Sequence, residues 1–491
     1  MVGRLRRRAD APRAVRSQGQ GDRAGGRGPR TRGPPRRPRP PPVLPARLRP
    51  GREGPRRPRR RQLRADRRAR GHGHAGGGGG PGAARRPRRL RRAGPGRRAQ
   101  GTARRPGRGG HRTVTGARRG GGAVNTGTHG DGDRRPRALV CGTGFGRVHL
   151  AALTAPDSAF ELAGILARGG ERSKACANEA DVPLFTRVDD VPGDIDLACV
   201  VLLGEVNGGP GSAVAAELMD RGVHVLQEGP LLRDELAAAL RAARRNRVVY
   251  RVNSHYVHLP PVRRFIAAAR ALRPVYVEAA CGVQVSYHLF DILGRALGGL
   301  RPFDLPPPTG RGPFRTIDGT LAGVPFTLRV QNQLHPADPD NHAHLLHRVT
   351  IGADGGTLTL AETHGPVLWS PRPHLPAEAR RTTRLDAAAD PGLDLPATSA
   401  IGPAAPPTYR EILASVWPEG ARRAIARTWE AVSEGSDPLR EGQYYLTVSS
   451  VWQAMATSLG YPERLSGPPH RPMPADELIA AARTELEESP T

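Results

Sequence analysis

A glycine-rich turn between an apolar run and an amphipathic stretch constrains the fold of this chain most. Residues 137–150 read RALVCGTGFGRVHL, which predicts a buried strand, a turn and the start of a helix. Glycines at such a turn let a phosphate approach the backbone, and the free N–H groups of the first helical turn bind it. The dinucleotide pattern G-x-G-x-x-G has one departure here, because its third glycine is replaced by Arg147. The residues predicted to contact a dinucleotide are Gly142, Thr143, Gly144, Phe145 and Gly146.

Apolar runs and amphipathic stretches alternate after this turn until about residue 255. The runs FELAGILA, IDLACVVLL, VHVLQE and VVYRVN have the length and composition of buried strands, and helical patterns separate them. Strand–helix alternation at this spacing is typical of a doubly wound parallel sheet. We therefore predict an α/β fold that begins with a dinucleotide-binding Rossmann domain at residues 137–255.

The pattern changes in the second half of the chain. Strand-like segments such as VYVEAACGVQV, VPFTLRVQNQL and GTLTLAE follow one another without long helices between them. This order predicts an α+β domain with a mostly antiparallel, open sheet at residues 256–475, which would carry the substrate and dimerisation surfaces. Residues 476–491 are expected to form a charged C-terminal tail.

The segment that precedes the first domain differs from the rest. Residues 1–137 contain 42 arginines, no lysine and six acidic residues, and they lack Phe, Trp, Tyr, Ile and Cys. A segment so poor in large apolar side chains cannot offset the entropy of ordering, so residues 1–136 are predicted to be a disordered leader. It could be a basic arm that binds nucleic acid. We favour translation upstream of the natural start of a GC-rich gene, since the chain has 75 arginines and one lysine, Lys174.

Targeting and metal-binding signals are missing from the sequence. No secretory signal and no stretch of about 18 apolar residues is found, so we expect a cytoplasmic protein with no membrane partner. The four cysteines show no paired spacing. The histidines and aspartates of HPADPDNHAHLLH fit no metal-ligand spacing, and hydride transfer needs no metal, so we expect no metal.

The choice of cofactor is read at the end of the second strand. Enzymes that use NAD place an acid there to bind the ribose hydroxyls, but this strand ends in Ala167 and Arg168. Arg168, Arg172 and Ser173 offer groups that bind a 2′-phosphate. The sequence therefore predicts NADPH.

Several motifs in order resemble one family. The short glycine loop, the turn LLGEVNGGPGSAVA, the strand end HVLQEGPL and the segment YRVNSHYVH resemble the thiazolinyl imine reductases, within the glucose–fructose oxidoreductase type. DPDNHAHLLHRVTIG, GTLTLAETHGPVLWS and YREILASVWPEG resemble later segments of the same family. The similarity spans residues 138–470.

This resemblance implies a function. It implies a Rossmann domain followed by an α+β domain, and NADPH-dependent reduction of a thiazoline C=N bond to a thiazolidine. The substrate would be a thioester on a carrier domain of a nonribosomal peptide synthetase that makes a siderophore of the pyochelin or yersiniabactin kind. The carrier domain is the expected partner, and the open sheet of the second domain suggests a homodimer.

The resemblance also implies roles for individual residues. Tyr256 matches the family's tyrosine and is the expected general acid, since its phenol is protonated at pH 7. His258 is expected to assist it, and His255 to contact the substrate in place of the family's aromatic residue. The family often has a histidine between the Glu and Pro of the strand end, where this chain has Gly229. The remaining candidates are Glu228 for the cofactor, and Gln284 and Tyr287 for the substrate.

Two other functions stay open. One is a sugar or cyclitol dehydrogenase of the same fold, but the lysine that related dehydrogenases place after the strand-end Glu is absent here. Alcohol oxidation needs a base for the hydroxyl proton, so this absence argues against it. The other is a nucleic-acid-binding protein that uses the arginine-rich leader on an inactive scaffold, which the irregular arginine pattern disfavours.

Overall fold

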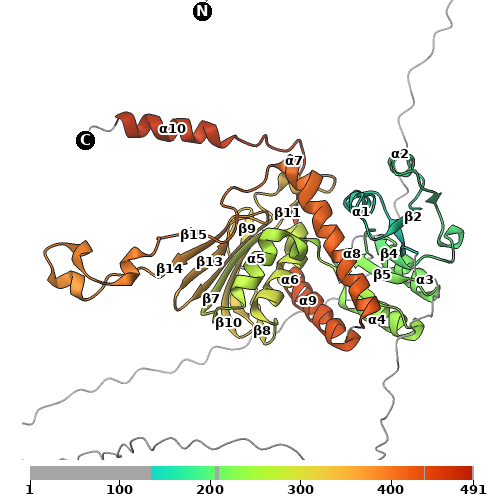
Figure 1. Cartoon of the computed structure of the whole chain (residues 1–491), viewed down its shortest axis with the longest axis horizontal. Helices are drawn as coiled ribbons and strands as arrows, with labels where there is room; N and C mark the ends of the chain where they lie inside the picture. The colour runs from blue at the N-terminus through green and yellow to red at the C-terminus, as the bar shows by residue number, and fades with distance from the viewer. Residues whose placement is uncertain (1–133, 205–208, 436, 489–491) are drawn as a thin grey trace, which may run out of the picture. The chain divides into compact units, whose positions relative to one another are not determined.

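The computed structural model describes residues 134–204, 209–435 and 437–488 (Figure 1). The predicted leader lies almost entirely outside these residues. Within them, no helix combines the length and the apolar character that crossing a membrane requires.

The first domain is built on a six-stranded parallel sheet in the order β3-β2-β1-β4-β5-β6. Its strands are β1 (Arg137–Cys141), β2 (Glu161–Leu166), β3 (Leu184–Phe185), β4 (Leu197–Val200), β5 (His224–Glu228) and β6 (Tyr250–Asn253). The helices are α1 (Gly146–Leu153), α2 (Glu171–Glu179), α3 (Gly211–Asp220) and α4 (Arg233–Asn246). The strand order reverses between β1 and β4, and ligands bind at such a reversal point.

The second sheet has eight strands in the order β15-β14-β13-β12-β7-β10-β9-β8. The pair β7 and β10 is parallel and the other pairs are antiparallel. The strands are β7 (Tyr276–Gly282), β8 (Phe303–Asp304), β9 (Phe314–Leu321), β10 (Val324–Gln331), β12 (His347–Ala353), β13 (Gly356–Leu360), β14 (Val367–Pro371) and β15 (Ser399–Ala400). The predicted fold class, a Rossmann domain followed by a mostly antiparallel sheet, is confirmed.

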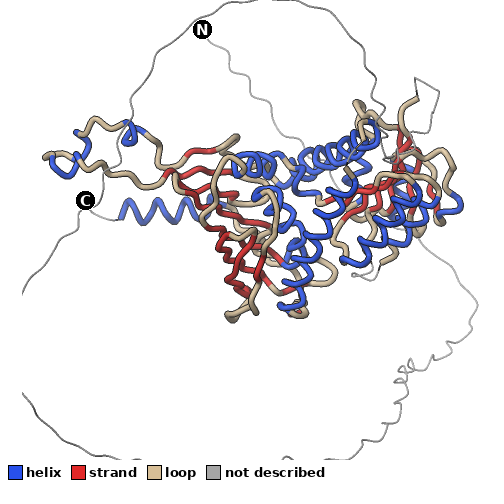
Figure 2. The backbone as a smooth tube through the Cα atoms, turned by 90° about the horizontal axis from the view of Figure 1, so that it is seen from below, coloured by secondary structure: helices blue, strands red, loops and turns tan. Residues whose placement is uncertain are grey.

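Some helices of the second half pack on this sheet and others reach the first domain (Figures 1 and 2). They are α5 (Pro260–Ala269), α6 (Ser286–Leu297), α7 (Tyr409–Glu411), α8 (Trp417–Ser433), α9 (Pro438–Leu459) and α10 (Ala475–Glu488). Helices α5 and α6 pack on the sheet, whereas α8 packs on α1 and α9 packs on α4. The C-terminal part of the chain therefore contributes to the surroundings of the first domain.

Short helical turns and a small third sheet complete the described structure. The short turns are η1 (Val188–Asp190), η3 (His255–His258), η4 (Val283–Val285), η5 (Asp340–His342), η6 (Glu378–Arg381), η7 (Leu385–Ala387), η8 (Pro391–Asp394) and the π-helical η9 (Ile412–Val416). Strands β11 (Gln333–Leu334) and β16 (Glu463–Arg464) pair in parallel. This pair fixes the chain beyond α9 beside the segment that follows β10.

Candidate active site

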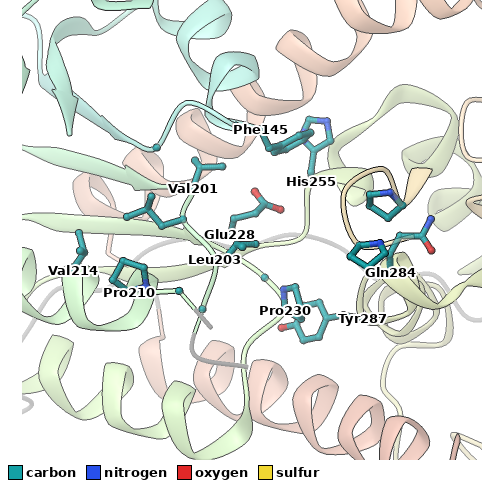
Figure 3. Close-up of a pocket in the computed structure, with 18 of the residues that line it drawn as sticks. Phe145, Val201, Leu203, Pro210, Val214, Glu228, Pro230, His255, Gln284 and Tyr287 are labelled. Atoms are coloured by element: carbon teal, nitrogen blue, oxygen red, sulfur yellow. The ribbon is translucent and has the colours of Figure 1, made fainter. Parts of the chain in front are cut away.

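A cavity of about 2040 Å³ opens at the C-terminal ends of the parallel strands (Figure 3). Its walls include the glycine loop, the ends of β2, β4 and β5, the turns η3 and η4, and the start of α6. Residues 334–340 and the end of α9 also line it. The volume exceeds the roughly 300–1,000 Å³ of an ordinary ligand pocket, so the cavity has room for more than one molecule.

The glycine loop has the geometry that a pyrophosphate requires. Gly142 has a φ of +97°, and a Cβ atom there would lie 2.6 Å from the carbonyl oxygen of Val201. A Cβ atom on Gly146 would lie 3.3 Å from Cγ1 of Val140, so Gly146 provides the close packing of helix on strand. Arg147 turns outward, and its Nε donates to the carbonyl oxygen of Gly144 at 3.2 Å. Gly146 therefore does the packing that the pattern assigns to a glycine at position 147.

The predicted loop residues divide between the cavity and the layer behind it. Gly142, Thr143, Gly144 and Phe145 line the cavity. Gly146 is buried at the start of α1.

The end of β2 and the start of α2 form the wall where an adenosine ribose would lie. Arg168 and Arg172 line the cavity with exposed side chains. Ser173 is buried, and its hydroxyl donates to the carbonyl oxygen of Gly170 at 2.7 Å, so this hydroxyl stabilises the start of α2. Glu171 also lines the cavity, and its carboxylate accepts from Lys174 at 2.9 Å. The one lysine of the chain is therefore remote from the end of β5.

Sequence reasoning missed a third arginine at this wall. Arg187 follows β3 and lines the same cavity, although it comes some way after the segment in which cofactor preference is usually read. Its guanidinium forms an ion pair with Asp189 at 2.8 Å. The parallel pairing of β2 with β3 brings this turn beside Arg168.

Glu228 stands at the end of β5 in the middle of the wall. In Figure 3 its carboxyl lies between Phe145 and His255 on one side and Pro230 and Tyr287 on the other. Burial raises the pKa of Glu228 to about 8, although hydrogen bonds from Asn253 and from the backbone of His255 oppose the shift. The Asn253 amide donates to Oε2 at 2.7 Å. The group therefore carries a proton for much of the time at neutral pH.

The space beside Gly229 is filled by Tyr287. A Cβ atom on Gly229 would lie 2.7 Å from Cε1 of Tyr287, whose side chain is only 2% exposed. The Tyr287 ring also packs edge-on against Trp452 with the ring centroids 5.7 Å apart. A histidine at position 229, which the family often has, would collide with this ring. Tyr287 thus lines the cavity as part of a tightly packed wall.

Tyr256 lies in the turn η3 and lines the cavity. Its ring packs edge-on against His288, at 5.1 Å between centroids, and against His347, at 4.9 Å. Among the described residues, no group hydrogen-bonds to its hydroxyl. Burial, together with the charges of Asp340, Glu228 and Glu362, raises the pKa of Tyr256 above its usual value, so the phenol keeps its proton at neutral pH.

His258 does not reach this cavity. Residues two apart in a 3₁₀ turn point about 120° apart, and His258, unlike Tyr256, is not among the residues that line the cavity. Burial lowers the pKa of His258 to about 3, with further contributions from the charges of Arg295, Arg251, Arg423 and Arg263. The structure thus gives His258 no contact with the Tyr256 hydroxyl. Of the imidazoles that pack on Tyr256, that of His288 on α6 lines the cavity and was not predicted.

His288 is oriented by a serine. Its Nδ1 lies 3.1 Å from the hydroxyl of Ser254, which precedes η3. Burial lowers the pKa of His288 to about 3, and the charge of His347 makes a smaller contribution in the same direction. The ring is therefore neutral. A serine that donates to Nδ1 leaves the proton on Nε2. A histidine in the first turn of a buried helix gives no local sequence signal of this placement.

The other two candidates also lie at the cavity. His255 is 1% exposed, and among the described residues neither of its ring nitrogens has a hydrogen-bond partner. Its ring packs edge-on against Phe145 at 4.9 Å between centroids. Gln284 donates from Nε2 to Oδ1 of Asp340 at 3.3 Å and lines the cavity from the side opposite the glycine loop.

The described residues form no candidate metal site. Within those residues, no group of three or more His, Cys, Asp or Glu side chains has a geometry that could hold a metal ion. The rings of His335 and His342 stack at 4.3 Å between centroids instead.

Family comparisons agree with this architecture. Residues 137–254 match the family described as "Oxidoreductase family, NAD-binding Rossmann fold". Residues 272–370 match the family described as "Thiazolinyl imine reductase Irp3-like, C-terminal". Among curated proteins, none matches the sequence at a significant level.

Solved structures are similar to this chain at low identity. KijD10, a 3-ketoreductase from Actinomadura kijaniata crystallised with TDP-benzene and NADP, is 15% identical with a TM-score of 0.50, over 68% of this chain and 100% of that one. UDP-N-acetylglucosamine 3-dehydrogenase GnnA from Acidithiobacillus ferrooxidans is 18% identical with a TM-score of 0.49, over 66% and 98% of the two chains.

The fold and the cavity together define the class of protein, which is a Rossmann-fold oxidoreductase. More particularly, residues 137–254 match the NAD-binding oxidoreductase family, and residues 272–370 match the C-terminal domain of Irp3-like thiazolinyl imine reductases. The resemblance seen in the sequence motifs is thereby confirmed.

Proposed function

We propose that this protein reduces the C=N bond of a thiazoline to a thiazolidine with NADPH, on an intermediate tethered to a carrier domain of a nonribosomal peptide synthetase. The match of residues 272–370 to the thiazolinyl imine reductase C-terminal domain carries this proposal. That segment supplies Gln284, Tyr287 and His288, which line the cavity opposite the glycine loop.

NADPH fits the cavity better than NADH does. The wall at the end of β2 presents Arg168 and Arg172, and among the described residues neither forms an ion pair there. Arginine binds phosphate by charge-assisted hydrogen bonds. The carboxylate of Glu171 is at the same wall, but Lys174 partly neutralises it.

Reduction of the C=N bond adds a hydride to carbon and a proton to nitrogen. NADPH supplies the hydride when it is bound. Tyr256 then donates its phenolic proton to the ring nitrogen, since its hydroxyl lies at the cavity with no protein partner among the described residues. This step leaves Tyr256 as a tyrosinate, and the Glu228 carboxyl does not repel the new charge while it is protonated. The proton is recovered from solvent through the open side of the cavity.

The outer part of the cavity suits a tethered substrate. Leu334, Pro336 and Leu459 line it, and Tyr461 at its edge is fully exposed. A thioester on a flexible phosphopantetheine arm can enter such an open cavity while its carrier stays outside. The enzyme would therefore act in trans on the synthetase.

The test is the reduction of a synthetic thiazoline thioester, followed by NADPH consumption at 340 nm and by mass spectrometry. We expect a product two hydrogens heavier, and faster turnover with NADPH than with NADH. A sugar or cyclitol substrate that is oxidised while the thiazoline is left unchanged would refute the proposal in favour of a dehydrogenase.

A further inference from the structure

Two sequence motifs from distant parts of the chain meet behind the glycine loop. ETHGP, residues 362–366, follows β13, and VWPEG, residues 416–420, begins α8. The indole Nε1 of Trp417 donates to Nε2 of His364 at 3.0 Å. Neither motif has a role in the chemistry proposed above, so their meeting point requires another explanation.

The hydrogen bond from Trp417 fixes the state of His364. Because Nε2 accepts from the indole, the ring proton must be on Nδ1, which lies 2.9 Å from a carboxylate oxygen of Glu362. Although burial raises it, the hydrogen bonds from His364 keep the pKa of Glu362 below its usual value. His364 is only 5% exposed. A hydrogen-bonded chain of the partly exposed Glu362, the buried His364 and the half-buried Trp417 holds the indole in one orientation.

The Trp417 indole contacts the side chain of Phe145 in the glycine loop. The centroid of the Phe145 ring is 5.5 Å from that of Trp417 and 4.9 Å from that of His255, and both contacts are edge-on. Phe145 stands between Gly144 and Gly146, where the backbone would bind the pyrophosphate. Glycines leave this backbone free to adopt other conformations, so a side chain held from outside restricts the loop.

The last residue of the second motif makes the approach of α8 possible. A Cβ atom on Gly420 would lie 2.8 Å from Cδ2 of Leu259 and 3.1 Å from Cε1 of His255. Glycine at this position therefore lets α8 lie directly against η3, with Trp417 one turn earlier over Phe145. The turn η9 before it is π-helical, which changes the rotational setting of the helix.

We propose that Trp417 is a positioning residue of the cofactor site, which His364 fixes and which holds Phe145 so that the glycine loop is preorganised for the dinucleotide. The motifs ETHGP and VWPEG thus act together on cofactor affinity. Preorganisation raises affinity by lowering the entropy lost on binding.

The test measures cofactor binding without substrate, so its outcome does not depend on the thiazoline chemistry. NADPH and NADH are each titrated calorimetrically into the full chain and into Trp417→Leu. We expect about three- to tenfold weaker binding of the better nucleotide, the range that the loss of an aromatic pair implies. Trp429→Leu is the matched control, since Trp429 lies on the same helix but packs on Phe160. Its affinity should stay within about twofold of the parent.

A double-mutant cycle shows whether Trp417 acts through Phe145. Phe145→Leu should weaken binding, and Phe145→Leu with Trp417→Leu should bind no more weakly than Phe145→Leu alone. Additive losses, or equal losses in Trp417→Leu and Trp429→Leu, would overturn the proposal. If Trp417→Leu does not fold, Trp417→Phe and His364→Phe replace it in the cycle, because each keeps an aromatic ring at its position but removes the indole–imidazole hydrogen bond. Parent affinity in both of these would also overturn it.

Discussion

The two ends of the cavity are built in different ways. At the cofactor end, the glycine loop and the arginines after β2 come from segments within one βαβ unit, next to one another in sequence. At the reacting end, Tyr256, His288 and Gly229 come from three elements, and their contacts depend on how the two domains pack. The first end follows from local backbone rules, whereas the second depends on tertiary packing. A substitution should therefore act on affinity at one end and on chemistry at the other.

The largest effect should come from Tyr256→Phe. This change keeps the ring that packs on His288 and removes the hydroxyl, so folding and cofactor binding should persist. General acid catalysis is worth about 10²–10⁴-fold, and kcat on a tethered thiazoline should fall by at least the lower figure. Steady-state kinetics at pH 7 measure this. Tyr276→Phe, on the outer face of β7, is the control. A Tyr256→Phe enzyme within about threefold of the parent would move the proton source to solvent or to a neighbouring group.

Gly229→Ala should damage the reacting end through packing rather than chemistry. The added Cβ meets the buried Tyr287 ring, and overpacking of this kind costs about 1–3 kcal/mol. Denaturant unfolding of the free protein measures the loss. Tyr287→Leu should reduce it, so that the double variant loses less than the sum of the single ones. For the same reason, Gly229→His is not expected to restore activity to Tyr256→Phe. Additive losses would show that the two residues are independent.

Arg168→Ala should change the cofactor end alone. The loss of an arginine–phosphate contact costs about 1–3 kcal/mol, so kcat/KM for NADPH should fall about tenfold. The value for NADH should change little, because NADH has no 2′-phosphate. Arg273→Ala, an exposed arginine outside the cavity, serves as the control. Equal efficiency of the parent with both nucleotides would contradict the assignment of NADPH.

A further effect concerns Glu228 and pH. Its pKa in the folded protein is raised from 4.5 to about 8 by burial, so between these values the folded state binds a proton that the unfolded state has released. The contribution of Glu228 to the free energy of unfolding therefore falls as the pH rises through this window. Glu228→Gln should show a shallower decrease than the parent in cofactor-free denaturation curves. Parallel pH profiles would mean that the carboxyl is better solvated than its surroundings indicate.

The contrast between local backbone rules and tertiary packing also explains what the sequence could predict. The strands of the first domain, the glycine loop and Arg168 were predictable, since apolar runs and glycine turns act locally. That Gly146 does the packing expected of the pattern's third glycine could not be predicted from the sequence. It is seen only in the contact between Gly146 and Val140. His288 and Trp417 could not be placed from sequence, because a helix pattern does not say which neighbour its buried face will meet. The role of His258 stays a prediction, since closeness to Tyr256 in sequence does not place it among the residues that line the cavity.

The contact of α8 with the glycine loop has a consequence for how the protein is made. The loop leaves the ribosome early, but Trp417 follows only after the whole second sheet has been synthesised. A nascent chain can form the parallel sheet of the first domain, since domains generally fold as units during synthesis. Its nucleotide site stays unfinished until the last helices arrive. A nascent chain that ends before α8 would therefore bind the dinucleotide more weakly than the complete protein.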